Sequence, residues 1–363
     1  MSTIVLSAGG TGGHLFPAQA VAAELKRRGR KIVLMTDARG RNYDTVFPGA
    51  IIETVPSASP SNTGLVGKAL APFQIASGIA IGFAKLKRLK PSAVVGFGGY
   101  PSLPVMLAAW LAGLPTVIHE QNAVLGRVNR LVADKVRAIA ASFPFAKFAP
   151  KDPDRITYTG NPVRPEAATL AHATYEALES DSPIHLLVFG GSQGARALSE
   201  LVPAAIAKLP QVLRWRLRVT QQGRPEDLDG LRKTYADAHI SADVAAFFND
   251  LPRRIANAHL VISRSGASTV SELAVIGRPA ILVPYPFAID DHQTANAGVL
   301  ANAGAGWLIQ QRDLTADSLA LLLEQILSDP ADLARRAETA ASLGKPNAAQ
   351  QLADLIERTG GLA

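Results

Sequence analysis

Three glycine-rich loops could bring backbone N–H groups close to an anionic ligand. They lie at residues 8–14 (AGGTGGH), 96–101 (GFGGYP) and 190–196 (GGSQGAR), and each follows a short apolar run. Glycine lets main-chain N–H groups approach an anion closely, and a helix that begins after the loop adds a favourable dipole. Tight turns between strands and helices also use glycine, but three such loops exceed what turning requires. The loops therefore predict one phosphate-rich ligand or two phosphorylated ligands.

Two nucleotide-binding fingerprints do not fit these loops. In the first loop Leu15 stands where the dinucleotide pattern G-x-G-x-x-G needs its third glycine. Asp37 nevertheless ends the second predicted strand, where a ribose-binding acid would lie in an NAD enzyme, so a dehydrogenase is kept as an alternative. The third loop lacks the Gly-Lys-Ser/Thr ending of a P-loop, which disfavours ATPase or kinase chemistry. Ser192 could bind a phosphate, and Arg196 fits a phosphate ligand and a solvated helix residue equally well.

Two polar segments of the second half could bind a nucleotide-sugar. Residues 263–272 (SRSGASTVSE) place hydroxyls and a glycine at a predicted helix start, which suits a diphosphate. The carboxylate of Glu272 could accept two ribose hydroxyls, although a capped helix with a surface glutamate is the plainer alternative. Residues 290–296 (DDHQTAN) could suggest a metal site. Without a partner cluster elsewhere, hydrogen bonding of Asp and Gln to sugar hydroxyls is simpler, and we expect no metal.

His14 is the side chain best suited to move a proton near neutral pH. It follows Gly12 and Gly13 at a predicted helix start, where the positive end of the helix dipole favours the neutral imidazole. The competing interpretation is a structural one, in which His14 caps the loop or only hydrogen-bonds a ligand.

Alternating strand-like and helix-like segments predict parallel sheets covered by helices on both faces. In the first half we expect strands at 4–7, 31–36, 93–96 and 116–119, with helices at about 17–28 and 104–111. The pattern restarts with a strand at 184–189 and a helix from about 197, followed by strands at 217–220, 260–262 and 280–283. Two strand–loop–helix openings predict an α/β fold of two doubly wound domains, joined near residues 160–162, with the site in a cleft between them.

The bulk composition narrows the class of protein. A chain of 363 residues with 48% hydrophobic and 18% charged residues is expected to form two globular domains. It has no cysteine, which excludes disulfides and thiolate metal sites and fits a reducing compartment. The first residues, MSTIVLS, resemble a strand, so we expect no signal peptide and a cytoplasmic protein.

The net charge of +7 suits phosphorylated ligands or anionic lipid better than nucleic acid. Basic residues are scattered, aromatics make up 6%, and no nucleic-acid-binding module is recognisable, so we expect no nucleic acid partner. Lys85, Lys87, Arg88 and Lys90 directly follow an apolar stretch at 75–84 that is too short to span a bilayer. An amphipathic surface helix and a membrane-contacting helix both fit this segment.

Taken together, the motifs resemble the MurG family of UDP-N-acetylglucosamine–undecaprenyl-pyrophosphoryl-muramyl-pentapeptide N-acetylglucosaminyltransferases. The resemblance runs in order through GGTGGHLFPA, GFGGYPSLP, HEQN (119–122), GNPVR (160–164), GGSQGAR and RSGASTVSEL to DDHQTANA, over nearly the whole chain. It implies a GT-B fold of two Rossmann-like domains. Residues 1–160 would face acceptor and membrane, 161–343 would bind the UDP-sugar, and helices from about 344 to 363 would return to the first domain. A UDP-N-acetylglucosamine epimerase of related fold stays an alternative.

The resemblance also implies an activity and its residues. N-acetylglucosamine would pass from UDP-N-acetylglucosamine to the C4 hydroxyl of undecaprenyl-pyrophosphoryl-MurNAc-pentapeptide, with inversion, at the cytoplasmic face of the bacterial inner membrane. His14 and Tyr100 match positions proposed to act near the acceptor. Positions that match the family's donor contacts are Thr11, Gly12, Gly13, Asn122, Arg164, Ser192, Phe248, Ala267, Ser268, Thr269, Val270, Ser271, Glu272 and Gln293. No cofactor is implied, and N–H groups, hydroxyls and Arg164 would stabilise the leaving diphosphate in place of a metal.

Overall fold

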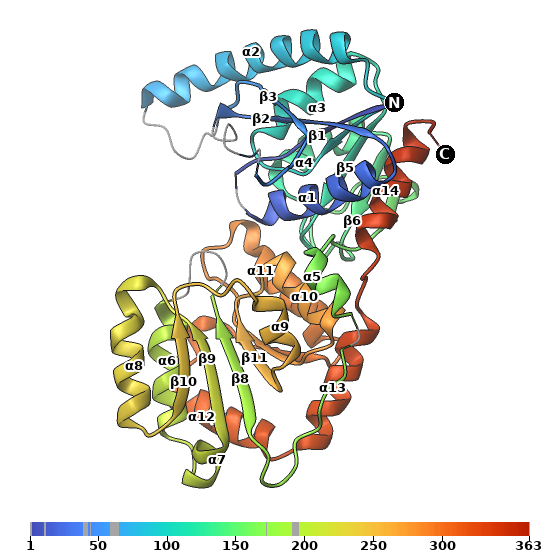
Figure 1. Ribbon diagram of the computed structural model, residues 1–363. Coiled ribbons are helices and arrows are strands. Elements are labelled where there is room, and N and C mark those ends of the chain that lie inside the picture. The colour runs from blue at the N-terminus through green and yellow to red at the C-terminus, as the bar shows by residue number, and fades with distance from the viewer. Residues whose placement is uncertain are drawn as a thin grey trace. The chain divides into compact units, whose positions relative to one another are not determined.

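The computed structural model describes residues 2–10, 12–38, 43, 45–58, 65–171, 173–190 and 196–362. The chain forms two compact units (Figure 1). Unit 1 comprises Met1–Arg164 and Asn347–Ala363, and unit 2 comprises Pro165–Pro346. The sequence placed these boundaries after residue 160 and near residue 344.

Unit 1 contains a seven-stranded sheet in the order β3-β2-β1-β4-β5-β6-β7. All neighbouring strands are parallel. The strands are β1 Thr3–Ser7, β2 Lys31–Thr36, β3 Ile51–Thr54, β4 Ala93–Gly96, β5 Thr116–Glu120, β6 Ala138–Ala141 and β7 Ile156–Tyr158. The order reverses between β1 and β4, which is the point where doubly wound sheets bind ligands.

Helices cover both faces of this sheet because alternate residues of each strand point to opposite sides. Ile4 and Leu6 of β1 share a core with Leu352 of the C-terminal helix, whereas Val5 shares a second core with Leu86 and Val105. The helices are α1 Gly12–Arg27, α2 Leu65–Leu89, α3 Ser102–Leu111, α4 Arg127–Val132 and α14 Ala348–Thr359, with single 3-10 turns at Ala133–Lys135 and Pro153–Arg155.

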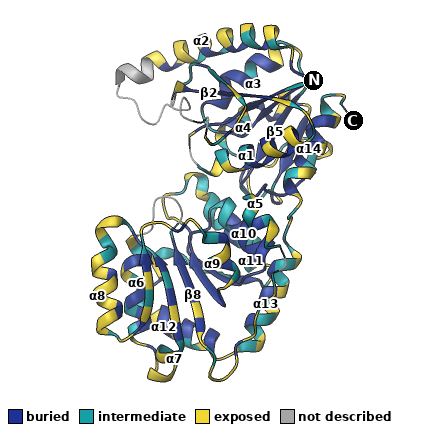
Figure 2. Cartoon of the chain, viewed as in Figure 1, coloured by how far each residue is buried: buried dark blue, intermediate teal, exposed yellow. Residues whose placement is uncertain are grey.

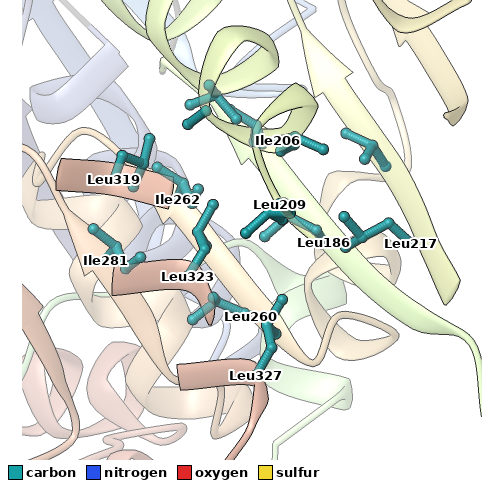
Figure 3. Packing of buried hydrophobic residues seen from close by; sticks show 14 of the residues in the cluster. Leu186, Ile206, Leu209, Leu217, Leu260, Ile262, Ile281, Leu319, Leu323 and Leu327 are labelled. Atoms are coloured by element: carbon teal, nitrogen blue, oxygen red, sulfur yellow. The ribbon is translucent and has the colours of Figure 1, made fainter. Parts of the chain in front are cut away.

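Unit 2 repeats the same plan with six strands in the order β10-β9-β8-β11-β12-β13, again all parallel. The strands are β8 Ile184–Phe189, β9 Leu217–Gln222, β10 Ser241–Ala245, β11 Leu260–Ser263, β12 Ala280–Leu282 and β13 Gly306–Leu308. Leu186, Leu217 and Leu260 from three strands pack against leucines of the helix Ala316–Leu327 and of the segment that follows Arg196–Ala207 (Figure 3).

Most helices of unit 2 carry exposed residues on their outer sides, while the central strands between them are mostly buried (Figure 2). They are α5 Pro165–Thr169, α6 Arg196–Ala207, α7 Gln211–Arg216, α8 Leu228–Asp237, α9 Leu251–Ala256, α10 Ala267–Ile276, α11 His292–Ala301, α12 Ala316–Leu327 and α13 Pro330–Ser342, with 3-10 turns at Pro225–Asp227, Ile289–Asp291 and Gln311–Asp313.

The predicted apolar stretch at 75–84 belongs to the long helix α2. Gly78 and Gly82 lie on its buried side, where an added Cβ at Gly82 would lie 3.3 Å from the Cβ of Ala108 in α3. Phe73 is 74% exposed on the other side. Among the described residues, no helix combines the length and apolar character needed to cross a membrane.

Candidate active site

The two glycine loops of unit 1 lie side by side because β1 and β4 are neighbours, with Ser7 paired to Gly96. Their backbones approach so closely that side chains would not fit. A Cβ on Gly9 would lie 2.8 Å from Cγ of Pro101, and one on Gly99, whose φ is +74°, would lie 2.9 Å from the carbonyl oxygen of Gly9. The first two loops are therefore parts of one surface at the carboxyl edge of the sheet.

His14 lies in the first turn of α1, because the helix begins at Gly12 and not near Pro17 as the sequence suggested. Its Nδ1 is 2.8 Å from the carbonyl oxygen of Phe97 and 3.3 Å from Oε1 of Gln121. Both neighbours accept hydrogen bonds, so Nδ1 carries the proton of the neutral ring. Nε2 is then left with a lone pair, which is the state a general base requires.

The first-turn N–H groups of α1 have no acceptor within the helix, as at any helix start. Gly12 and Gly13 supply two of these groups. Thr11, which the sequence also placed at the donor, lies outside the described residues. Tyr100 is half-buried and packs against the core cluster beneath α3.

Sequence reasoning missed the residue that organises the loop after β5. Glu120 is 1% exposed, yet its carboxylate is well satisfied. The backbone N of Asn122 donates to Oε1 at 3.1 Å, and the backbone N of Gly126 donates to Oε2 at 2.8 Å. The side-chain amides of Asn122 and Asn129 donate to the same carboxylate at 3.2 and 2.8 Å. The signal was a charged residue at the end of an apolar strand, and its role is to fix the position of Asn122.

In unit 2, the start of α10 carries hydroxyls that lack partners. The N-cap is Gly266, which has no side chain to satisfy the first N–H groups of the helix. The Oγ atoms of Ser263, Ser268 and Ser271 are buried with no hydrogen-bond partner in the described part of the chain. Such groups are costly to bury unless a ligand or water completes them.

The other residues predicted around α10 differ in what they can offer. Glu272 is 4% exposed, and Val270 is fully buried in the core, so its side chain cannot meet a ligand. Ala267 is also buried, and Thr269 is half-buried. Ala267, Ser268 and Thr269 can contribute their first-turn N–H groups, which have no intrahelical acceptor.

The segment 290–296 is tied to α10 by hydrogen bonds. Ser265 Oγ donates to the carbonyl oxygen of Gln293 at 2.8 Å, and Asn296 donates back to the carbonyl oxygen of Ser265 at 3.2 Å. Oε1 of Gln293 accepts from the backbone N of Tyr285 at 2.9 Å. Gln293 is thus held at the carboxyl edge of the sheet, beside the start of α10.

The acidic pair of this segment forms local contacts. Asp290 and Asp291 adopt positive φ values of 55° and 56°, and Asp291 accepts from Thr294 at 2.7 Å. His292 lies 2.8 Å through Nδ1 from the carbonyl oxygen of Ile289. Across the described ranges, no three His, Cys, Asp or Glu side chains gather as metal ligands would.

Phe248, Arg164 and Ser192 complete the predicted set. Phe248 is buried, and the guanidinium of Arg254 lies 4.1 Å from its ring centroid. Arg164 is half-buried at the last residue of the first segment of unit 1. Ser192 lies outside the described residues. Arg264, to which the sequence gave no role, donates to the carbonyl oxygens of Val283 and Pro284, and burial lowers the pKa of its guanidinium.

A cavity of about 460 Å³ in unit 2 is lined by none of the predicted donor-site residues, although its lining includes Arg254, which lies over the ring of Phe248. Its lining includes His185, Arg218 and His259, which begin or precede β8, β9 and β11. Because parallel sheets bind ligands at the carboxyl ends of their strands, this cavity is not part of the predicted donor site.

Comparison with known proteins identifies the family. The glycosyltransferase family 28 N-terminal domain matches residues 4–141 and the family 28 C-terminal domain matches residues 185–352. A UDP-N-acetylglucosamine–N-acetylmuramyl-(pentapeptide) pyrophosphoryl-undecaprenol N-acetylglucosamine transferase of Granulibacter bethesdensis is 51% identical over 359 residues, covering 98% of this chain and 93% of the relative.

Solved structures agree with this assignment. The crystal structure of Acinetobacter baumannii MurG superposes with a TM-score of 0.82 at 32% identity, covering 99% of this chain and 100% of that one. A putative UDP-N-acetylglucosamine 2-epimerase from Listeria monocytogenes reaches 0.64 at 15% identity, covering 98% of this chain and 96% of that one, which shows a shared fold alone. The two parallel sheets are therefore the Rossmann-like domains of a GT-B glycosyltransferase, and the chain belongs to glycosyltransferase family 28 and, within it, to the MurG family.

Proposed function

We propose that this protein transfers N-acetylglucosamine from UDP-N-acetylglucosamine to the C4 hydroxyl of undecaprenyl-pyrophosphoryl-MurNAc-pentapeptide, with inversion at the anomeric carbon, as a step of peptidoglycan synthesis. The observation that carries the proposal is the 51% identity, over nearly the whole chain, to a relative named for that transfer. The fold alone is weaker support for this activity, because a putative UDP-N-acetylglucosamine 2-epimerase has the same fold.

The donor binds chiefly to unit 2. The start of α10 offers to the diphosphate N–H groups that have no acceptor within the helix, and the hydroxyls of Ser268 and Ser271, which have no partner among the described residues, are available as further donors. Glu272 accepts the ribose hydroxyls, Gln293 contacts the sugar, and the backbone near Phe248 faces the uracil. Unit 1 binds the acceptor and adds donor contacts from Gly12, Gly13, Thr11 and Asn122.

His14 acts as the general base. Displacement at an anomeric carbon needs the attacking hydroxyl to lose a proton as the bond forms. The proton passes from the C4 hydroxyl to Nε2 of His14, while Nδ1 keeps its bond to the carbonyl oxygen of Phe97. Tyr100 lies on the neighbouring glycine loop and contacts the acceptor.

The leaving UDP carries developing negative charge, which the protein stabilises without a metal ion. N–H groups at the starts of α1 and α10, together with Arg164 and Ser192, supply the hydrogen bonds. No redox or group-carrying cofactor takes part.

The protein works at the cytoplasmic face of the inner membrane, because its acceptor is anchored there. The exposed apolar side of α2, with Phe73 and Ile81, provides the contact surface. Lys85 and Arg88 both bind Glu53. Lys87, which lies over the ring of Phe83, and Lys90 have no ion pair in the described part of the chain, and they can meet lipid phosphates. Salt-sensitive cosedimentation with anionic vesicles is expected, and equal binding by Phe73→Ser/Ile81→Ser would reject this surface.

One experiment separates the candidate functions. The protein is incubated with labelled UDP-N-acetylglucosamine, with and without the muramyl lipid. Label that moves to the lipid supports the transferase. Conversion of the nucleotide-sugar to an epimer without lipid would instead establish an epimerase, and a change in nicotinamide absorbance would indicate a dehydrogenase.

A further inference from the structure

Gln121 occupies a buried position behind the proposed base. It is 2% exposed and lies directly after β5. Its amide contacts three groups from different parts of unit 1. Oε1 lies 3.3 Å from Nδ1 of His14, while Nε2 lies 2.8 Å from the carbonyl oxygen of Phe97 and 3.2 Å from Nδ1 of His119.

Chemistry fixes the orientation of this amide. The carbonyl oxygen of Phe97 can only accept, so the NH₂ group must face it. A rotated amide would place Oε1 against that carbonyl oxygen and would turn N–H groups towards the protonated Nδ1 of His14. Both contacts would be repulsive, which leaves one orientation in which Gln121 accepts from His14 and donates to His119.

His119 extends the same line of hydrogen bonds. It is wholly buried, and burial lowers its pKa to about 4, so the ring is neutral at physiological pH. Its Nδ1 accepts from Gln121, which places its proton on Nε2. Nε2 lies 3.4 Å from the carbonyl oxygen of Gly160, the acceptor at the end of the line. Its ring also packs against Phe97, with centroids 5.6 Å apart.

We infer that Gln121 is a positioning residue for His14, acting together with neutral His119. Every donor in the line His14–Gln121–His119–Gly160 points away from Nε2 of His14. When Nε2 of His14 takes up a proton, the dipoles of these hydrogen bonds are therefore already aligned to stabilise the positive charge of the imidazolium. Gln121 supplies one of the two acceptors for the Nδ1–H group, and Phe97 supplies the other. This inference rests on the proposed role of His14 as the base.

The competing explanation is that Gln121 only satisfies a buried carbonyl and holds the ends of β4 and β5 together. The pH dependence of turnover separates the two roles. Gln121→Met keeps the length of the side chain but removes its acceptor, so the imidazolium loses one partner. The acidic limb of the turnover profile should move to lower pH by about half to one unit, and the plateau should fall about tenfold. Donor affinity should stay unchanged.

Gln121→Glu provides the conservative rescue. An acceptor oxygen still faces His14, and any negative charge would favour the imidazolium, so the acidic limb should lie at or above the wild-type pH. Ser7→Ala is the matched control, because the hydroxyl of Ser7 donates a buried bond to the carbonyl oxygen of Met35 and does not serve His14. It should lose stability without moving the limb. Thermal unfolding of each variant verifies that it is folded.

Direct evidence comes from ¹⁵N NMR of histidine-labelled free protein, with His14 and His119 assigned from their alanine variants. The neutral rings should carry their protons on Nδ1 in His14 and on Nε2 in His119. Either opposite tautomer would overturn the inference, as would an acidic limb that moves alike in Gln121→Met and Gln121→Glu. If the tautomers are as expected but His14→Ala keeps its turnover, the base assignment fails while the hydrogen-bond line stands.

Discussion

Gly98 gives a test of how closely the second glycine loop must approach His14. Its φ is +82°, a conformation that costs other residues about 1–2 kcal/mol. A Cβ at this position would lie 3.3 Å from Cε1 and 3.4 Å from Nδ1 of His14, so the imidazole must shift by a few tenths of an ångström. Gly98→Ala should therefore reduce the free energy of unfolding by about 1–2 kcal/mol and displace the proposed base.

The displacement should appear in turnover. A misplacement of about 1 Å can cost on the order of 100-fold in rate, so a few tenths should cost roughly three- to tenfold. Gly113→Ala is the control, because Gly113 has a φ of +68° and no atom within 4 Å of an added Cβ. It should lose similar stability in denaturant unfolding and keep its turnover at saturating donor and acceptor. Equal turnover of the two variants would refute the view that Gly98 makes room for His14.

Further outcomes follow from the same site and fold. His14→Ala should lower turnover by about 10²–10⁴-fold with donor affinity nearly unchanged and the acidic limb lost; a fall below tenfold would exclude the base role. Glu272→Ala should weaken UDP-N-acetylglucosamine binding by about 1.5–3 kcal/mol in titration calorimetry, and unchanged affinity in a folded variant would remove Glu272 from the donor site. Exhaustive chelation should leave activity intact, whereas loss restored by magnesium would show a metal requirement. Burial lowers the pKa of His119 to about 4, whereas the pKa of this histidine in the unfolded chain is about 6.5. As pH falls, the unfolded chain is therefore protonated at His119 before the folded protein is, and the free energy of unfolding should decline between about pH 6.5 and pH 4. Hydrogen bonds from Arg27 and Arg28 lower the pKa of Glu24 to about 2, so its contribution is lost as pH falls from 4.5 towards 2; flat unfolding free energies over both ranges would contradict these assignments.

Most strands that the sequence predicted are buried on both faces, whereas β9 alternates between buried and more exposed residues. β1, β2, β4, β5 and β8 are nearly continuous apolar runs, which is typical of central parallel strands. Of the missed strands, β3, β7, β10 and β13 lie at the edges of their sheets and are largely half-buried or exposed, so they lack that signal. The missed strand β6 is buried, but three of its four residues are alanines, which are depleted in strands. The early start of α1 was missed because glycines at residues 12 and 13 disfavour a helix on intrinsic propensity.

The residues that hold His14 and Asn122 in place could not be predicted from local sequence patterns. The Nδ1 partners of His14 stand 83 and 107 residues away in the chain, and only the sheet order brings them together. The motif at residues 119–122 contributes to the family resemblance, but the sequence of four adjacent residues does not show which of them binds a ligand. The structure separates their tasks: Glu120 orders the loop, Gln121 faces His14, and Asn122 is held at the surface of that loop.

The start of α10 differs from the starts of α12 and α13 in the same unit. α12 starts with a capping box in which Thr315 and Ser318 satisfy each other's backbone, and α13 starts with Asp329 accepting from Asp332. Both also carry an acidic residue in the first turn, which offsets the positive end of the dipole. α10 has neither device: its cap is Gly266, and its first turn has no acid. α7, α9 and α11 also start without a side-chain cap or a first-turn acid, so the missing cap alone does not distinguish α10. The uncapped start of α10 is combined with buried hydroxyls of Ser263, Ser268 and Ser271 that have no partner within the described residues, and an anionic ligand that completes the site explains this combination best.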